Sequence, residues 1–233
     1  MYMKVRLHLL TLILVSFTMV VIHACKKDDD SDPANQEIRD IDGNVYTAVT
    51  IGNQVWMAQN LKTTRFRDGS ALAYPGSDLT GWKNNTTGAY AYLFNDEASF
   101  RETYGALYNW AAVNTGKLCP EGWHVPTESD WNLLFGFLGD SMVAGGKMKT
   151  SDTTLWLSPN TGASNSSGFS ALPGGYRDHN GMDGLLKKNA FFWTADNAST
   201  NNAWHHKLDY QSTQAYGGKR NKRYGLSVRC LKD

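Results

Sequence analysis

A short uncharged stretch near the N-terminus constrains most strongly where this chain of 233 residues can fold. Residues 9–22 carry no charged side chain, and Lys4 and Arg6 precede them in a segment without acidic residues. A basic segment followed by a short apolar one is typical of a secretory signal. A helix of that length reaches about 21 Å, less than the ~30 Å hydrocarbon core of a bilayer. We therefore expect export, with a permanent transmembrane helix as the alternative.

Cys25 follows the apolar stretch in the tetrapeptide Ile22-His23-Ala24-Cys25. The tetrapeptide resembles the lipobox of bacterial lipoproteins: an aliphatic residue, two further residues of which the second is small, and a cysteine that receives lipid. The resemblance implies a signal peptide over residues 1–24, lipidation of Cys25 and the membrane as a partner through that lipid. Several acyl chains would make the anchor permanent, since each buried CH₂ contributes about 0.8 kcal/mol.

Residues 25–39 are charged, contain Pro33 and include four aspartates between positions 28 and 32. We expect a flexible acidic tether, because this composition offers nothing to bury. An acidic run directly after the lipidated cysteine also resembles the surface-export signal of Bacteroidota lipoproteins. The resemblance implies an outer-membrane lipoprotein exposed at the cell surface. The alternative is a plain spacer in a lipoprotein that faces the periplasm.

Cys119 and Cys230 remain as an even pair once Cys25 is lipidated. An even pair in an exported protein predicts a disulfide, here one that closes a long loop, because the compartment is oxidising. Two free buried thiols are the alternative.

The charge balance argues against nucleic acid as a partner. The chain has 23 basic and 22 acidic side chains, and removal of residues 1–24 takes away two of the basic ones. Nucleic-acid binders carry a basic surplus, and the remainder of this chain is close to neutral. One short basic cluster, which we interpret as a solvated loop, comprises Lys219, Arg220, Lys222 and Arg223.

Hydrophobic patterns predict a hairpin near the start of the folded part. Residues 45–51 and 54–57 are strand-like and flank a Gly52-Asn53 pair. Further strands are predicted at residues 169–172, 190–194, 203–208 and 224–231. Stretches rich in Gly, Asn, Asp and Thr predict loops over residues 62–101 and 158–168.

Two helices are predicted between these regions. Apolar spacing indicates a short helix over residues 104–114. Thr127 and Asp130 fit a capping pattern ahead of an apolar face that ends near Gly139, which predicts a second helix. A hairpin, loops, two helices and then strands indicate an α+β domain.

Six blocks of sequence carry a family resemblance, at residues 42–46, 51–61, 104–110, 119–127, 168–177 and 227–230. In this order and spacing they resemble the Fibrobacter succinogenes major paralogous domain, known mainly from exported bacterial proteins without an assigned activity. The resemblance implies a single domain over residues 40–233. That family is similar in turn to the formylglycine-generating enzyme and to C-type-lectin-like folds. The wider similarity implies a loop-rich α+β domain with short antiparallel strands and two main helices.

Catalysis does not carry over from the formylglycine-generating enzyme, which uses paired metal-binding cysteines in its C-terminal region. This chain has one cysteine there, Cys230. His205 and His206 are adjacent, and neighbouring side chains of a strand point to opposite faces, so they cannot readily share a metal. We expect no metal centre and no cofactor, although the oxygens of residues 40–44 leave a structural calcium open.

A hydrolase acting on extracellular glycans is the enzymatic alternative. It would require two carboxylates within about 5–10 Å of each other. The candidates are Asp178, Asp183, Asp196 and Asp209. No spacing in the sequence brings two of them together, so we expect a protein that is not an enzyme.

Aromatic side chains among polar residues suggest a binding module for a glycan or a protein, because flat rings beside amides suit sugars and interfaces. The candidates are Trp82, Trp156, Trp193, Trp204, Tyr176 and Tyr210. Core packing is the alternative for each tryptophan, since tryptophan is highly buried on average. Thr153, in Asp152-Thr153-Thr154, resembles the O-glycosylation site of Bacteroidota exported proteins. The sequence thus predicts a surface binding or adhesion module, with a structural envelope component as a further alternative.

Overall fold

The computed structural model describes residues 37–233. Cys25, the predicted signal peptide over residues 1–24 and most of the predicted tether lie outside the described residues. Ile38, two residues before the predicted domain boundary, is already buried. Within the described part of the chain, no helix combines the length and the apolar character needed to cross a membrane.

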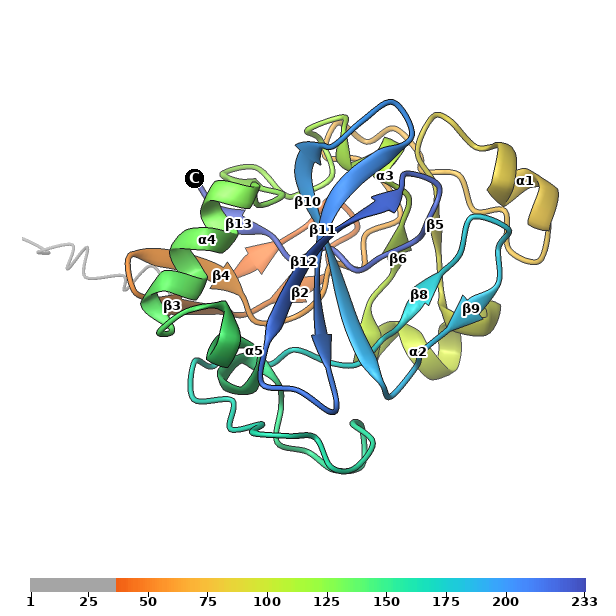
Figure 1. The fold of residues 1–233 in the computed structure, drawn as a ribbon. Coiled ribbons are helices and arrows are strands. Elements are labelled where there is room, and N and C mark those ends of the chain that lie inside the picture. Colours follow the sequence, from red (N-terminus) through yellow and green to blue (C-terminus); the bar gives the residue numbers. More distant parts are fainter. Residues whose placement is uncertain (1–36) are drawn as a thin grey trace, which may run out of the picture. The chain divides into compact units, whose positions relative to one another are not determined.

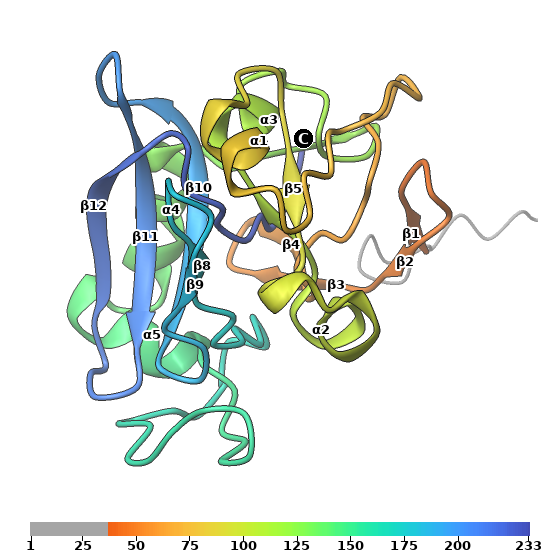
Figure 2. The same ribbon diagram turned by 90° about the vertical axis from the view of Figure 1, so that its right-hand side faces the viewer.

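A three-stranded antiparallel sheet forms one side of the domain, as Figure 2 shows. Its strands, in spatial order, are β10 (Asn189–Asn197), β11 (Asn202–Asp209) and β12 (Ala215–Asn221). The predicted strands at residues 190–194 and 203–208 are confirmed. β12 was not predicted, because Gly217, Gly218 and three polar residues at its end hide its strand character.

A four-stranded sheet joins both ends of the described chain. Its order is β3 (Ala48–Ile51), β4 (Gln54–Met57), β13 (Leu231–Lys232) and β7 (Trp123–His124). The predicted hairpin is confirmed, with Ile51 opposite Gln54 across the Gly52-Asn53 turn. Leu231 pairs with both Trp56 and His124, so the last strand holds the two halves of the sheet together.

Three two-stranded sheets, five α-helices and one short 3₁₀ helix complete the described part (Figure 1). The small sheets are β1 (Ile38–Arg39) with β2 (Val45–Tyr46), β5 (Tyr90–Ala91) with β6 (Leu107–Tyr108), and β8 (Tyr176–Arg177) with β9 (Asp183–Gly184). The helices are α1 (Leu79–Asn84), η1 (Leu93–Asn95), α2 (Glu97–Tyr104), α3 (Trp110–Val113), α4 (Glu128–Phe137) and α5 (Ser141–Met148). The structure is the loop-rich α+β domain that the sequence predicted.

The predicted helix over residues 104–114 is wrong. α2 ends at Tyr104, β6 follows, and only α3 is helical in the rest of the segment. Gly105 breaks the helix with a φ of 73°, and a Cβ there would lie 2.6 Å from the carbonyl oxygen of Leu61. Leu107 then pairs with Ala91, so tertiary pairing overrides the helical spacing.

The other predicted helix is confirmed. α4 begins after Thr127, whose side chain accepts a hydrogen bond from the Asp130 backbone while Asp130 accepts one from the Thr127 backbone. Gly139 has a φ of 106° just past the end of the helix. Two strand predictions were too long, since residues 169–172 and 224–230 form only isolated bridges. The predicted loop over residues 62–101 contains α1, β5, η1 and the first part of α2, whereas residues 158–168 form no helix or strand.

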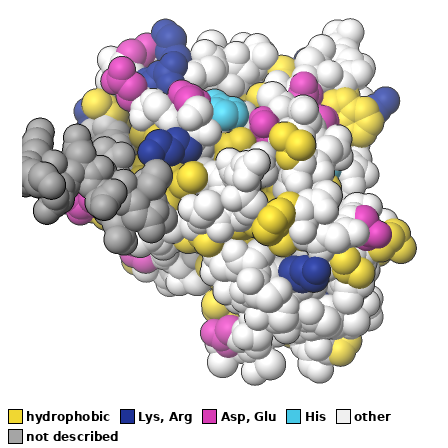
Figure 3. Space-filling model, turned by 90° about the vertical axis from the view of Figure 1, so that its left-hand side faces the viewer, with side chains coloured by type: hydrophobic (Ala, Val, Ile, Leu, Met, Phe, Trp, Pro, Cys, Tyr) yellow, Lys and Arg dark blue, Asp and Glu magenta, His cyan; other side chains and the backbone are white. Residues whose placement is uncertain are grey.

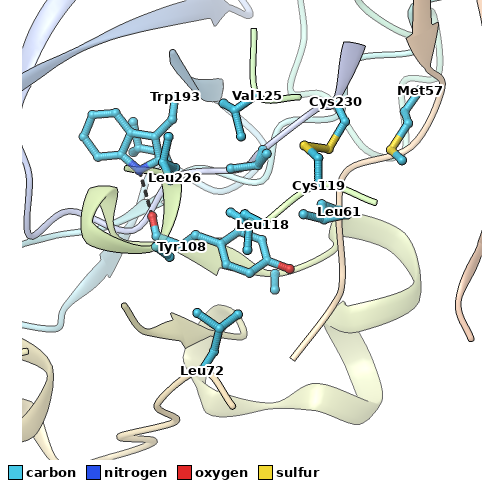
Figure 4. Packing of buried hydrophobic residues seen from close by; sticks show 14 of the residues in the cluster. Met57, Leu61, Leu72, Tyr108, Leu118, Cys119, Val125, Trp193, Leu226 and Cys230 are labelled. Carbon is cyan, nitrogen blue, oxygen red and sulfur yellow. Dashed lines mark hydrogen bonds between the residues drawn. A yellow bond between two sulfur atoms is a disulfide. The ribbon is translucent and has the colours of Figure 1, made fainter. Parts of the chain in front are cut away.

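The two largest hydrophobic clusters of the described residues are rich in aromatic rings. One surrounds the predicted disulfide, which is confirmed between Cys119 and Cys230 (Figure 4). In the same core the Trp193 indole donates to the Tyr108 carbonyl at 2.7 Å. The other core lies between the three-stranded sheet and α4, where the Trp131 ring contacts Trp56 and Phe192. Burial of such rings supplies most of the stabilisation of a domain with short elements.

Arg229 ties three of the six family blocks together inside this interior. Its side chain is fully buried and donates to Oδ1 of Asn60 at 2.7 Å and to the carbonyl oxygen of Phe169. Asn60 in turn donates to the carbonyl oxygen of Tyr104 at 2.9 Å. Burial lowers the pKa of Arg229 to about 9. The family motifs thus form a structural network, because their polar groups bind each other.

Candidate functional site

Three of the six predicted ligand-binding aromatics are core residues instead. Trp82, Trp156 and Trp193 are each at most 1% exposed. Their indole N–H groups donate to the carbonyl oxygens of Asp178, Ala171 and Tyr108. A buried ring with a bonded N–H cannot reach a ligand, so core packing is the correct interpretation for these three.

The other three aromatics are partly exposed but are not brought together. Trp204 lies opposite Lys219, whose Nζ is 5.0 Å from the ring centroid. The Tyr176 ring contacts the guanidinium of Arg220. Arg220 follows Lys219 in β12, so its side chain and Tyr176 lie on the opposite face of the sheet from Lys219 and Trp204. Tyr210 packs against the core between the sheet and α4. The predicted aromatic platform is therefore not one site.

Thr153 is exposed in a turn after α5. A modifying enzyme could reach its hydroxyl there, and its glycosylation stays a prediction.

The two adjacent histidines lie on opposite faces of β11. His206 contacts the rings of Trp131 and Phe135, with centroids 5.1 Å and 4.9 Å away. His205 contacts Phe191 on the other face. Both are buried, and burial lowers the pKa of His205 to about 3. They are packing residues, which agrees with the argument that they cannot share a metal.

The four carboxylates considered for glycoside hydrolysis each accept hydrogen bonds within the chain. Asp183 pairs with the buried guanidinium of Arg177 at 2.9 Å. Asp196 accepts from the backbone N–H of Glu128 at 2.6 Å. Asp178 and Asp209 accept from backbone N–H groups in their own turns. These bonds favour structural roles for the four side chains.

The turn at residues 40–44 is held by protein donors. Asp40 accepts from the backbone N–H groups of Asp42 and Asn44, each at 3.0 Å. Asp42 accepts from Nε of Arg65 at 2.6 Å. Burial raises the pKa of Asp42, but the hydrogen bonds that it accepts from the Thr64 backbone and from the Arg65 side chain help to outweigh this effect and hold the value at about 2. Among the described residues, no group of three or more His, Cys, Asp or Glu side chains could hold a metal ion.

A buried lysine, Lys149, lies at the end of α5. Lys149 is fully buried, and its Nζ donates to the carbonyl oxygens of Thr161, Asp209 and Ser212 at 3.0, 2.8 and 2.9 Å. Burial lowers its pKa to about 8. The ammonium group pins two loops to the helix end.

A hollow of about 280 Å³ lies where α3, the loop after α1, the β10–β11 loop and the end of β12 meet. Figures 1 and 2 both show α1, α3 and the β10–β11 loop at the same end of the domain. The positions of these loops are fixed by backbone bonds, among them Lys222 N–H to the Asn201 carbonyl and Trp110 N–H to the Lys222 carbonyl. The hollow is therefore a preformed feature of the fold.

Polar side chains without a carboxylate line this hollow. They are four asparagines, two threonines and two cations: Asn85, Asn114, Asn201, Asn221, Thr86, Thr200, Lys222 and Arg223. Trp110 and Ala111 supply its apolar wall. We call this feature the amide hollow.

Two asparagines of the amide hollow are held in fixed orientation. Oδ1 of Asn85 accepts from the backbone N–H of Gly88 at 3.0 Å and from Nδ2 of Asn109 at 2.9 Å. Oδ1 of Asn221 accepts from the backbone N–H of Arg223 at 3.0 Å. Within residues 37–233, the Nδ2 groups of Asn85 and Asn221 have no hydrogen-bond acceptor in the chain. The fixed amides therefore offer donors to a ligand.

Lys222 covers the ring of Trp110. Its Nζ is 4.6 Å from the ring centroid and donates to the Thr200 carbonyl at 3.1 Å. Trp110 is 5% exposed, and its indole N–H donates to the Thr194 carbonyl. The amide hollow thus offers hydrogen-bond donors and positive charge, with little open ring surface for stacking.

A larger hollow of about 840 Å³ lies beside β1 and is lined by charges of both signs. Lys117 bonds Asp68 there at 2.8 Å, and Arg39 is paired with Glu37 at 2.7 Å. Much of its charge is thus neutralised within the chain, which makes it the weaker candidate for a ligand site.

The outer side of α4 exposes apolar side chains. Leu133 and Phe137 are 63% and 65% exposed. Figure 3 shows the hydrophobic side chains on that side of the domain as separate spots among backbone and other side chains. Scattered apolar groups are normal on a protein surface and define no site.

Sequence reasoning missed the amide hollow because asparagine is common in turns for reasons of backbone geometry. Asn85 and Asn221 do shape their turns, and only the structure shows that the two residues line one hollow. The basic cluster at residues 219–223 was the sequence signal that could have pointed to the amide hollow, because Lys222 and Arg223 line it. The cluster lies at the end of β12 and in the turn that follows.

The fold and the amide hollow together define a loop-rich α+β domain whose best-formed polar site suits binding. The family described as the Fibrobacter succinogenes major domain matches residues 49–232, most of the chain. The chain belongs to that family, as its sequence blocks predicted. No curated protein and no solved structure matches it. The more distant similarity to the formylglycine-generating enzyme and to C-type-lectin-like folds stays a prediction.

Proposed function

We propose that this protein is a lipid-anchored, surface-exposed binding module of the cell envelope, without catalytic activity, and that it binds a glycan in the amide hollow. The observation that carries the proposal is the pair of fixed amides, Asn85 and Asn221. Both residues line the same preformed hollow, and within residues 37–233 their Nδ2 groups have no acceptor. Sugars present many hydroxyl oxygens, which accept hydrogen bonds from such donors.

The remainder of the amide hollow supports a glycan as well. Thr86 and Thr200 add groups that both donate and accept. Loops at one end of a rigid sheet are common positions for binding residues, because they vary without disturbing the scaffold. The lipobox-like tetrapeptide at Cys25 supports a membrane anchor, and the acidic run after it supports surface display.

A glycan array probed with the full-length chain in detergent micelles tests the proposal. We expect at least one glycan to bind, and Asn85→Asp and Asn221→Asp each to weaken binding by about tenfold. These variants keep the oxygen that accepts the turn N–H groups but lose the free donor. Asn132→Asp, on the exposed side of α4, is the matched control and retains binding.

The proposal fails if no glycan binds at high protein concentration. It also fails if the two aspartate variants bind as well as the unaltered chain, since the site would then lie elsewhere.

A further inference from the structure

The basic cluster at residues 219–223 is placed on aromatic rings instead of on acids. Lys219 lies over Trp204 at 5.0 Å, Arg220 over Phe191 at 4.7 Å, and Lys222 over Trp110 at 4.6 Å. Arg223 is exposed. Throughout the described residues, none of these four cations forms an ion pair with a carboxylate. A ring orients a cation without neutralising it, so the cluster keeps its positive charge.

Two of these cations, Lys222 and Arg223, line the amide hollow. The oriented polar groups beside them, Nδ2 of Asn85 and Nδ2 of Asn221, are donors because their paired oxygens already accept bonds from the chain. No aspartate or glutamate is among the residues that line the hollow. The lining thus combines hydrogen-bond donors with positive charge and contains no carboxylate that would repel an anion.

We infer that the ligand of the amide hollow is an acidic glycan, one that carries carboxylate or sulfate groups. The inference deepens the proposed function and rests on it. Lys222 and Arg223 bind the anionic group, and the amides and threonines bind the hydroxyl oxygens around it.

A nucleic acid fits the hollow less well. Single-stranded nucleic acids are bound largely by stacking of bases on open aromatic rings. Trp110, the aromatic residue in the lining, is 5% exposed and is covered by Lys222. The site therefore offers charge and donors without a stacking platform.

The test measures binding of the full-length chain to two matched pairs of glycans. One pair is polygalacturonate and its fully methyl-esterified form; the other is chondroitin sulfate and its desulfated, carboxyl-reduced form. Each pair keeps the sugar backbone and removes the charge. We expect at least one acidic member to bind about tenfold more tightly than its neutral partner, and to weaken as salt is raised.

Two variants test whether Lys222 and Arg223 supply the charge that binds the acidic glycan. Arg223→Gln and Lys222→Gln/Arg223→Gln should each remove the preference for the acidic member. Arg223 is exposed, so the single variant leaves the fold intact. Lys187→Gln/Lys188→Gln changes two exposed lysines before β10, at the other end of the sheet, and should keep the preference.

The outcomes separate the inference from the proposed function. If glycans bind through Asn85 and Asn221 with no preference for the acidic members, the inference is wrong and the proposed function stands. If polyphosphate or polyglutamate binds as tightly as the acidic glycan and is lost with the same variants, the site is a general anion site and the inference is wrong. If no glycan binds, both are wrong.

Discussion

Arg229 and Asn60 form a buried hydrogen bond of 2.7 Å between residues that are 169 positions apart in the sequence. The guanidinium also binds the carbonyl oxygen of Phe169 and lies over its ring at 4.4 Å. A cation is expensive to bury, and here its donors satisfy acceptors from two other family blocks. The bond therefore connects a segment near the start of the domain with one near its end.

Arg229→Met should lower the free energy of unfolding by about 3 kcal/mol, because two buried acceptors lose their donor. Urea unfolding of the full-length chain measures the change. Arg67→Met, at an exposed position, is the control and should change stability by less than about 0.5 kcal/mol. An Arg229→Met chain as stable as the control would contradict the structural role of the network.

Reduction of the disulfide should destabilise the domain strongly. Cys119 and Cys230 close a loop over 111 positions, and the chain-entropy account gives up to about 4.7 kcal/mol for such a loop. Urea unfolding with and without a reductant measures the loss, and Cys119→Ala/Cys230→Ala should match the reduced chain. An unfolding midpoint that does not respond to the reductant would show that the cross-link does not constrain the unfolded chain.

His205 should make the domain sensitive to mild acid. Burial, helped by the charge of Arg220, lowers its pKa from 6.5 to about 3 in the folded state. The unfolded chain then binds the proton more tightly, so stability is full above about pH 6.5 and falls as the pH drops toward 3. Between pH 7 and pH 5 we expect a loss of about 2 kcal/mol.

His205→Gln removes that proton and should flatten the pH dependence between pH 7 and pH 5. His179→Gln, in the partly exposed turn between β8 and β9, should leave it unchanged. Equal slopes for the His205→Gln chain and the unaltered chain would rule out His205 as the titrating group. Carboxylates with lowered pKa values, such as Asp42, act only at more acidic pH.

Protease treatment of intact cells should remove the protein, and mass analysis of its N-terminus should find lipid on Cys25. The expectation rests on the tetrapeptide that ends at Cys25 and on the acidic run after it. Protection from the protease with the same lipid would place the protein in the periplasm and favour a structural envelope role. An uncleaved, unlipidated N-terminus would contradict the anchor itself.

Local patterns in the sequence predicted the elements that local chemistry controls. The hairpin around Gly52-Asn53 and the capping box of Thr127 and Asp130 are set by residues close together in the chain. The disulfide followed from the two cysteines that remain once Cys25 is assigned to lipid, in a chain that we expect to be exported. The α+β class followed from the order of the elements.

Non-local contacts explain what the sequence did not predict. Leu107 has helical spacing but lies in β6, where it pairs with Ala91 of β5. The glycines of β12 gave no strand signal. Trp82 and Trp193 are candidates for ligand contact in the sequence until their N–H partners, the carbonyl oxygens of Asp178 and Tyr108, are known. The amide hollow is built from four separate segments, which only the fold brings together.

The most direct test of the central claim is an NMR titration of the full-length chain with a glycan that binds in the array. The side-chain amide signals of the asparagines are recorded as the glycan is added. The account predicts that the Nδ2 signals of Asn85 and Asn221 shift with saturation, while that of Asn132 on α4 does not move. Saturable shifts confined to other residues, with Asn85 and Asn221 unchanged, would contradict a glycan site in the amide hollow.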